Sequence, residues 1–123
     1  MAWLFVALGG ALGAVARYAI SLVFPYAGSG FPLGTFFANS LGAFLMGVLY
    51  VVIVDKALVD PVFRLLFMVG GMGALTTFST FSIEALSLIQ NGHHQMAAMY
   101  IFASVGVCLC FVYLGMNLTQ KFL

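Results

Sequence analysis

One stretch of the sequence combines residue types that could bind a small ion inside a membrane. Residues 70–84 read GGMGALTTFSTFSIE, so glycines are followed by hydroxyl side chains, two phenylalanines and a carboxylic acid. Glycine permits backbone conformations outside the helical range. A backbone that leaves the helix within a bilayer must be buried in protein or line a wet cavity. We therefore expect a broken helix here that handles a small polar or ionic species.

The aromatic and hydroxyl side chains of this stretch could line a path for an anion. Phe78 and Phe81 are three residues apart, which places them on one face of a helix. The edge of an aromatic ring carries partial positive charge, and Ser79 and Thr80 could donate hydrogen bonds beside the rings. Alternatively, these hydroxyl groups donate to carbonyls of their own helix, as is common in membrane helices.

Three further polar side chains lie within other apolar stretches, where such residues are costly and are candidates for function. The amide of Asn39 could donate to an anion, or it could form a hydrogen bond between helices. Tyr100 and Ser104 are four residues apart and share a helix face. They could line the same path, or they could be an interfacial tyrosine and a serine bonded to its own helix.

Arg17 and Glu84 are the two charged residues that lie well inside apolar spans. Both spans run in the same direction, and the rise of 1.5 Å per helical residue places the two charges at a similar depth. We expect them to influence each other directly or through water. The alternative for Arg17 is that its guanidinium group extends to the membrane interface.

The composition points to an integral membrane protein. The 123 residues are 64% hydrophobic and only 6% charged, whereas about 25% of the residues in a soluble domain are charged. The formal net charge of +1 and the lack of a basic patch argue against a nucleic-acid partner. The sequence contains no nucleophile–base arrangement, phosphate loop or metal-ligand cluster, so we do not expect an enzyme. Cys108 and Cys110 are expected to be small buried residues on different helix faces.

Four apolar stretches are long enough to cross a bilayer, which takes about 20 helical residues. They cover residues 2–24, 33–54, 62–90 and 95–118, with short connections, so residues 1–123 are expected to form one all-helical transmembrane domain. No basic region precedes the first stretch, which favours a retained helix over a cleaved signal peptide. Three basic residues lie on the side of the membrane that holds the termini, and one lies on the other side. Because basic residues are enriched on the cytoplasmic side, this difference weakly favours cytoplasmic termini.

Pairs of small residues four positions apart allow helices to approach closely. Gly9 and Gly13 form such a pair, and the contact could lie within a protomer or between protomers. Four short helices enclose little volume, so a pore or carrier would form between two copies of the chain. We therefore expect an oligomer.

Taken together, the motifs resemble the Fluc fluoride channels, also called the CrcB family. The resemblance covers essentially the whole chain. It rests on GGALGAVARY at residues 9–18, on the Gly34–Asn39 segment with Gly42 and Gly47, on residues 70–84 with their TTFSTFS run, and on Tyr100 with Ser104. It implies four transmembrane helices, the third broken within the membrane. It also implies an antiparallel, dual-topology homodimer, in which one protomer is inverted, in the cell inner membrane.

The resemblance also implies roles for individual residues. Two fluoride paths would run along the dimer interface, lined by the ring edges of Phe78 and Phe81. Their polar companions would be Asn39, Ser79, Thr80, Tyr100 and Ser104. A structural Na⁺ that is not transported would be held by the backbone carbonyls of Gly73 and Thr76 from both protomers. Arg17 and Glu84 would belong to a vestibule or support the path. The implied function is passive export of cytoplasmic fluoride and hence fluoride resistance.

Two other functions fit parts of the sequence. A small proton-coupled multidrug or cation exporter is also a four-helix, dual-topology dimer. Such exporters need a carboxylate near the middle of the bilayer, usually in the first helix, and the first helix of this sequence has Arg17 and no acid. A non-transporting membrane assembly subunit would account for the helices but not for the costly polar cluster. Such a subunit predicts no ion flux from the purified protein in liposomes.

Overall fold

The structure is a computed structural model that describes residues 1–123, and all its regular elements are helices. They are α1 (Ala2–Val23), α2 (Leu33–Leu49), the π-helical η1 (Tyr50–Asp55) and η2 (Arg64–Met72), α3 (Gly73–Leu75), α4 (Phe78–Gln90) and α5 (His94–Phe122). Four continuous or nearly continuous spans are long and apolar enough to cross a membrane: Ala2–Val23, Leu33–Asp55, Arg64–Gln90 and His94–Phe122. The four predicted spans are confirmed, with ends displaced by no more than a few residues.

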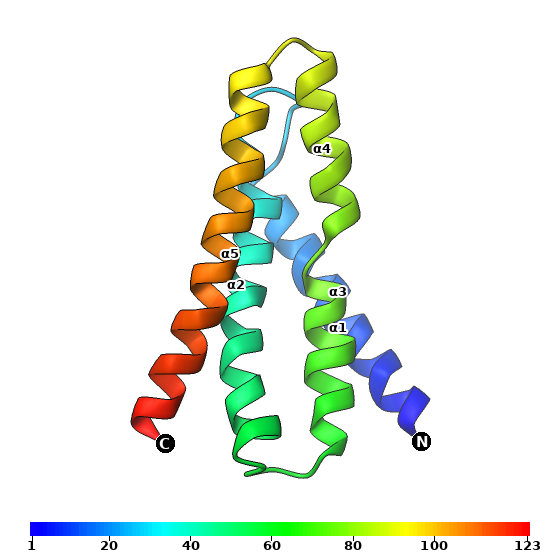
Figure 1. Ribbon diagram of the computed structural model, residues 1–123. Helices are drawn as coiled ribbons and strands as arrows, with labels where there is room; N and C mark the ends of the chain where they lie inside the picture. Colours follow the sequence, from blue (N-terminus) through cyan, green and yellow to red (C-terminus); the bar gives the residue numbers. More distant parts are fainter.

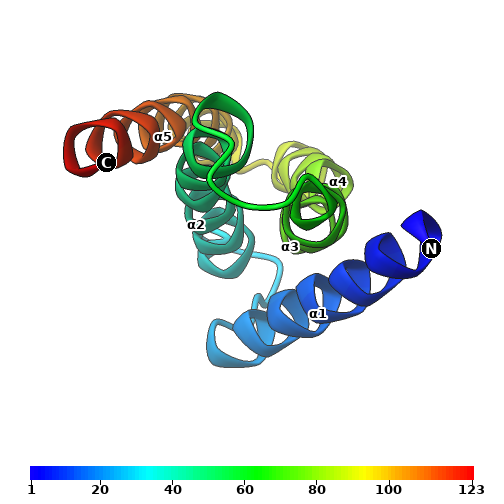
Figure 2. The same ribbon diagram turned by 90° about the horizontal axis from the view of Figure 1, so that it is seen from below.

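The helices form an open bundle rather than a closed one. α2 packs along α5, and α4 packs against α5 towards the turn that joins them. α1 packs against η2 and α3 and runs obliquely away from the other helices towards the N-terminus (Figures 1 and 2). Both termini and the η1–η2 connection lie at the same end of the molecule (Figure 1), as an even number of spans requires.

Glycines bring the backbones of α1 and η2 into direct contact. A Cβ atom at Gly9 would overlap the carbonyl oxygen of Leu66, and one at Gly13 would overlap the carbonyl oxygen of Gly71. A Cβ atom at Gly70 would lie 2.5 Å from the carbonyl oxygen of Val6. The Gly9/Gly13 pair therefore serves packing within the protomer, which is one of the two possibilities that the sequence left open.

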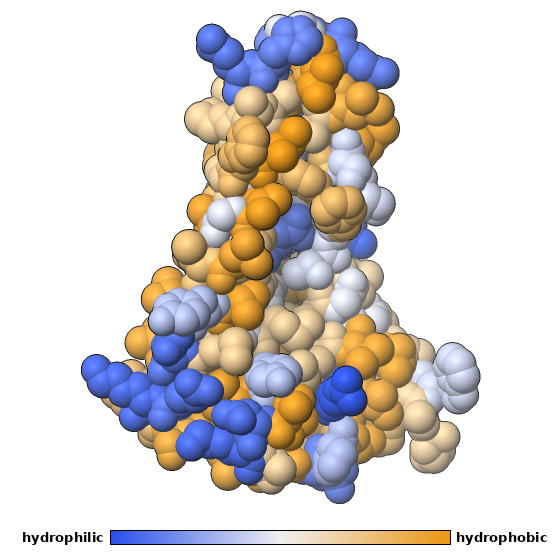
Figure 3. Space-filling view, in the orientation of Figure 1, coloured by the Kyte–Doolittle hydropathy of each residue, from blue (hydrophilic) through white to orange (hydrophobic).

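Most apolar side chains of the protomer lie on its surface. A small core of Phe81, Ala85, Leu88, Ala97 and Tyr100 joins α4 to α5. Hydrophobic residues cover much of the middle of the molecule, and hydrophilic residues gather towards its two ends (Figure 3). This distribution suits a chain whose middle faces lipid or another protein and whose ends face water.

The third span is broken at two threonines. Thr76 has φ −82° and ψ 151°, and Thr77 has φ −148° and ψ 115°, so both residues are extended. The prediction of a broken third helix is confirmed, but the predicted cause is wrong. Gly73 keeps helical angles of φ −59° and ψ −33°, and Gly70 serves close packing. The extended residues are β-branched, a side-chain shape that tolerates extended backbone well.

Candidate functional site: a cavity at the helix break

The break redirects the backbone hydrogen bonds of the third span. In a continuous helix the N–H of Thr77 would donate to the carbonyl of Gly73, but it donates to Asn39 Oδ1 at 2.7 Å instead. In a continuous helix the N–H of Thr80 would donate to the carbonyl of Thr76, but it donates to Thr77 Oγ1 at 3.2 Å instead. The carbonyls of Gly73 and Thr76 are thereby left without their helical donors.

A third carbonyl at the break is satisfied by a charged side chain from α1. Arg17 Nε donates to the carbonyl oxygen of Ala74 at 2.9 Å. The last carbonyl groups of a helix lack hydrogen-bond donors from within the helix. Arg17 provides such a donor to the carbonyl of Ala74 at the end of α3. The guanidinium group is therefore held at the break.

Asn39 binds the break from the opposite side. Besides accepting from the N–H of Thr77, its Nδ2 donates to the carbonyl oxygen of Thr77 at 3.2 Å. The interhelical hydrogen bond considered from the sequence is present. A primary amide has two N–H donors, so one of them remains for a guest beside Asn39.

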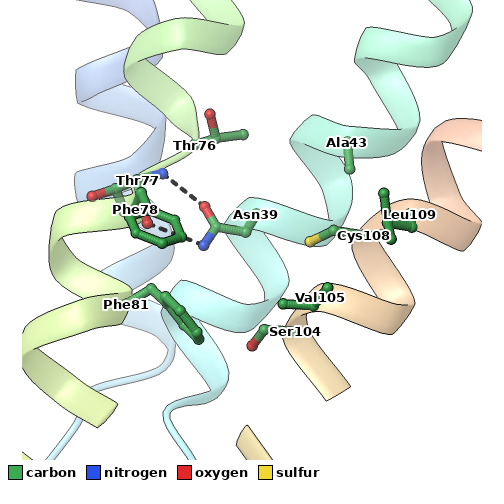
Figure 4. A pocket seen from close by; sticks show the side chains of 10 residues that line it. All are labelled: Asn39, Ala43, Thr76, Thr77, Phe78, Phe81, Ser104, Val105, Cys108 and Leu109. Atoms are coloured by element: carbon green, nitrogen blue, oxygen red, sulfur yellow. Dashed lines mark hydrogen bonds between the residues drawn. The ribbon is translucent and has the colours of Figure 1, made fainter. Parts of the chain in front are cut away.

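A cavity of about 360 Å³ lies between α2, the break, the start of α4 and α5 (Figure 4). It brings together four of the predicted path residues: Asn39, Phe78, Phe81 and Ser104. Its other lining residues are Ala43, Thr76, Thr77, Val105, Cys108 and Leu109. The Ser104 side chain is 6% exposed and its Oγ atom has no hydrogen-bond partner. The cavity therefore offers a free donor to a small polar guest.

The two phenylalanines at the cavity differ in their surroundings. Their ring centroids are 5.5 Å apart, with the ring planes at 49°. Phe81 is 8% exposed and its ring also packs on Tyr100, at 5.1 Å between centroids. Phe78 is 78% exposed and projects from the protomer. One ring is thus fixed in the core, and the other is available to a neighbouring molecule.

Three other predicted path residues do not line this cavity. Thr77 Oγ1 donates to Thr80 Oγ1 at 3.0 Å and lies 3.3 Å from Ser79 Oγ, so these hydroxyl groups form a cluster at the N-terminus of α4. Thr80 also lines a second cavity, of about 310 Å³, together with Arg17. Contrary to the alternative interpretation, neither the Ser79 nor the Thr80 hydroxyl bonds to a carbonyl of its own helix; Ser82, one turn further along, donates to the carbonyl of Phe78. The third residue, Tyr100, lies behind Phe81.

Glu84 is held by hydroxyl groups rather than by Arg17. Thr35 Oγ1 donates to Oε1 at 2.5 Å, and the Tyr100 hydroxyl donates to Oε2 at 3.4 Å. The two intramembrane charges thus bond to different partners, and no direct ion pair joins them. Thr35 also lines the second cavity with Arg17, so it lies between the two charges.

Sequence reasoning did not assign a role in the site to Thr35, and it interpreted Tyr26 only as an aromatic residue at the membrane interface. Thr35 precedes Asn39 by four residues, a spacing that places both on one face of α2 and that could have singled it out. The Tyr26 hydroxyl, in the α1–α2 connection, is buried without a partner. Its burial and, secondarily, the charge of Glu84 raise the pKa of Tyr26, so this tyrosine stays neutral at physiological pH.

The prediction for the cysteines is wrong in part. Cys110 is exposed, and Cys108 is half-buried in the cavity wall. In a membrane protein the surface is as apolar as the interior, so an apolar sequence context does not indicate burial.

The fold and the site together define a small multi-pass membrane protein with a broken helix beside a mostly apolar cavity that a few polar side chains line. Irregular backbone at membrane depth occurs where it lines such a cavity or is buried in protein. The chain belongs to the CrcB family, because the family model described as CrcB-like protein, Camphor Resistance (CrcB), matches residues 4–116.

Curated relatives cover nearly the whole chain. A protein of Saccharophagus degradans named fluoride-specific ion channel FluC is 54% identical over 119 residues, which span 97% of this chain and 90% of the relative. Proteins of the same name from Hahella chejuensis and Magnetococcus marinus are 51% and 46% identical, over 97% and 94% of this chain and 94% of each relative. The family resemblance stated from the motifs is confirmed.

Proposed function

We propose that this protein is a fluoride-selective channel that lets fluoride leave the cytoplasm passively. The observation that carries the proposal is the cavity at the helix break, where the Asn39 amide, the unpartnered Ser104 hydroxyl and the rings of Phe78 and Phe81 meet. Its relatives are named as ion channels rather than enzymes, which agrees with the non-enzymatic function expected from the sequence.

The chemistry of the cavity suits a small, strongly hydrated anion. A pore must replace the water of such an ion with other groups, while binding it weakly enough to allow exit. The second N–H of Asn39 and the O–H of Ser104 are neutral donors, and the ring edges of Phe78 and Phe81 are weakly positive. No charged side chain lines this cavity. Fluoride would therefore be solvated without being trapped by a fixed cation.

The direction of transport follows from the membrane potential. A negative-inside potential of 100 mV acts on one elementary charge with about 2.3 kcal/mol. That energy drives an anion outward without a coupled energy source. Passive export through the inner membrane would lower cytoplasmic fluoride and so confer resistance to it.

The working unit in this proposal is a homodimer with one protomer inverted in the membrane. The 78% exposure of Phe78 supports it, because a path-lining ring on an exposed surface needs a second surface to complete the path. The small difference in the number of basic residues between the two membrane sides also supports it. A chain with nearly equal numbers of basic residues on the two sides can insert in both orientations. Two equivalent fluoride paths would result.

The break also fits a structural Na⁺ between the protomers. The carbonyls of Gly73 and Thr76 have lost their helical donors, and carbonyl oxygens are suitable ligands for a hard alkali cation. Gly73 is exposed on its own protomer, so its carbonyl is available to an ion shared with a partner. When bound, the cation would supply positive charge beside the cavity and favour an anion there.

Fluoride efflux from liposomes tests the proposed function. The purified protein is reconstituted with sodium present, and loss of fluoride is read with a fluoride electrode beside a matched chloride experiment. Fast fluoride loss without chloride loss is expected. Folded protein without fluoride flux would refute the proposal: cation-coupled proton movement would then indicate an exporter, and no flux of any ion would indicate a non-transporting subunit.

A further inference from the structure

The cavity at the helix break contains a thiol. Cys108 lies on α5 one helical turn beyond Ser104, and its sulfur points towards Asn39 across the cavity (Figure 4). Cys110 is two residues further along, is exposed, and does not line the cavity. Both cysteines are free. The chain therefore carries one thiol inside the cavity and a matched one outside it.

Ser104 places an unpartnered polar group on the same cavity wall as Cys108. Its hydroxyl is buried without a partner in the protein, and buried polar groups are normally bonded to protein or to ordered water. The cavity of about 360 Å³ has room for several waters, each of which takes about 30 Å³ in the liquid. Because residues four apart share a helix face, Cys108 faces the same cavity as Ser104.

We propose that Cys108 is a covalent modification site inside the conduction cavity, and that small neutral thiosulfonates and disulfides close the fluoride path by attaching to it. The proposal rests on the proposed function, because closure is defined by loss of fluoride flux. A methylthio group on Cys108 adds apolar bulk between Asn39 and Ser104. It offers no hydrogen-bond donor, so a fluoride ion loses both space and solvation at that point.

The reaction with methyl methanethiosulfonate illustrates the chemistry. The thiolate of Cys108 attacks the sulfur that carries the methyl group. A new S–S bond forms as the bond from that sulfur to the sulfonyl sulfur breaks, and methanesulfinate leaves with the electron pair. The thiol proton passes to the buffer. A reducing dithiol exchanges with the mixed disulfide, releases methanethiol and restores the free Cys108.

The test combines flux with mass spectrometry on the full chain in liposomes. Wild type, Cys108→Ala and Cys110→Ala are treated with methyl methanethiosulfonate, fluoride efflux is measured before and after, and peptide mapping locates the methylthio groups. Wild type and Cys110→Ala are expected to lose most of their efflux and to recover it after reduction. The efflux of Cys108→Ala is expected to be unaffected by the reagent.

Three results would overturn the proposal. The first is that wild type keeps its fluoride efflux although peptide mapping shows Cys108 to be modified. The second is that the reagent labels Cys110 but not Cys108. The third is equal inhibition of Cys108→Ala and wild type. Absence of fluoride efflux before treatment would instead refute the proposed function. In that case, the labelling of Cys108 relative to Cys110 still decides whether the cavity is open to the reagent.

Discussion

Asn39 of α2 binds both backbone groups of Thr77, the second extended residue of the break. The Thr77 N–H donates to Asn39 Oδ1 at 2.7 Å, and Asn39 Nδ2 donates to the Thr77 carbonyl at 3.2 Å. One side chain thus holds the broken backbone to α2 and also lines the adjacent cavity. Any substitution at Asn39 therefore acts on both the path and the break.

Replacing Asn39 by aspartate should stop conduction. The carboxylate cannot donate to the Thr77 carbonyl, and it places a negative charge in the cavity. Two unit charges of like sign 4 Å apart repel by about 4 kcal/mol at an effective dielectric constant of 20. We expect fluoride efflux from liposomes to fall by at least about a hundredfold, where each factor of ten corresponds to 1.4 kcal/mol. Asn117→Asp is the control, because Asn117 is exposed and bonds only to Tyr113 of its own helix.

Removing the aromatic rings at the cavity should slow efflux with little effect on the proposed dimer. We expect Phe78→Ile and Phe81→Ile each to reduce fluoride efflux by about tenfold, because aromatic electrostatic interactions of 0.5–1.5 kcal/mol are lost. Phe102→Ile is the matched control, since Phe102 is 77% exposed, as Phe78 is, but lies outside the cavity. Wild-type efflux from the Phe78/Phe81 double mutant would contradict the assignment of the rings to the path.

Sodium should specifically stabilise the proposed dimer. A cation that binds only the native state at 100 times its dissociation constant adds about 2.7 kcal/mol to the free energy of unfolding. The check is the thermal midpoint of the detergent-solubilised protein over a series of sodium concentrations, with choline replacing sodium at constant ionic strength. Equal midpoints in the two salts would argue against the cation site at Gly73 and Thr76.

Breaking the hydroxyl contacts of Glu84 should lower stability. Thr35→Val removes the donor to Oε1 and leaves that oxygen unpaired within the protein. Hydrogen bonds to charged groups contribute about 1.5–3 kcal/mol, and we expect a loss of stability in that range if the carboxyl is ionised. Thr119→Val removes a hydroxyl that bonds only to its own helix, at Gly115, and serves as the control in thermal unfolding. Equal midpoints for the two variants would show that the Thr35 contact is not stabilising.

The contact between α1 and η2 should not tolerate a single added methyl group. Gly13→Ala would place Cβ into the carbonyl oxygen of Gly71, whereas Gly10→Ala meets no atom within 4 Å. We expect Gly13→Ala to lower the thermal midpoint strongly, because overpacking costs about 1–3 kcal/mol or more. Gly10→Ala should be neutral or slightly stabilising, as alanine is the better helix former.

Hydrophobicity and length are enough to predict the four spans, because a bilayer requires long apolar helices with few alternatives. The position of the break also follows from the sequence, because a hydroxyl-rich run inside an apolar span is costly without a structural role. Which residues leave the helix does not follow. The sequence does not distinguish a glycine that allows a non-helical backbone from a glycine that allows a neighbouring helix to pack closely. Gly70 has the second role, because it contacts the backbone of α1.

The partners of the polar side chains depend on how the helices are aligned along one another. Similar depth made Arg17 and Glu84 a reasonable pair, but depth does not determine which helix faces meet. The packing of α1 on α3 directs Arg17 to the carbonyl of Ala74, and the packing of α2 near α4 brings Thr35 to Glu84. Asn39 and Ser104 stood out as polar residues within other apolar spans, and Phe78 and Phe81 as rings next to the break, but only the family resemblance grouped these four residues along one path.

The glycine contact between α1 and η2 also limits how this protein can evolve. Every single-base change in a glycine codon that alters the residue adds at least a Cβ atom, and at Gly9 and Gly13 that atom meets a backbone carbonyl rather than a side chain. A second substitution in the opposing helix can shorten a side chain, but it cannot remove a backbone carbonyl group. A substitution at either position therefore requires the two backbones to move apart, whereas one at Gly10, between them, does not.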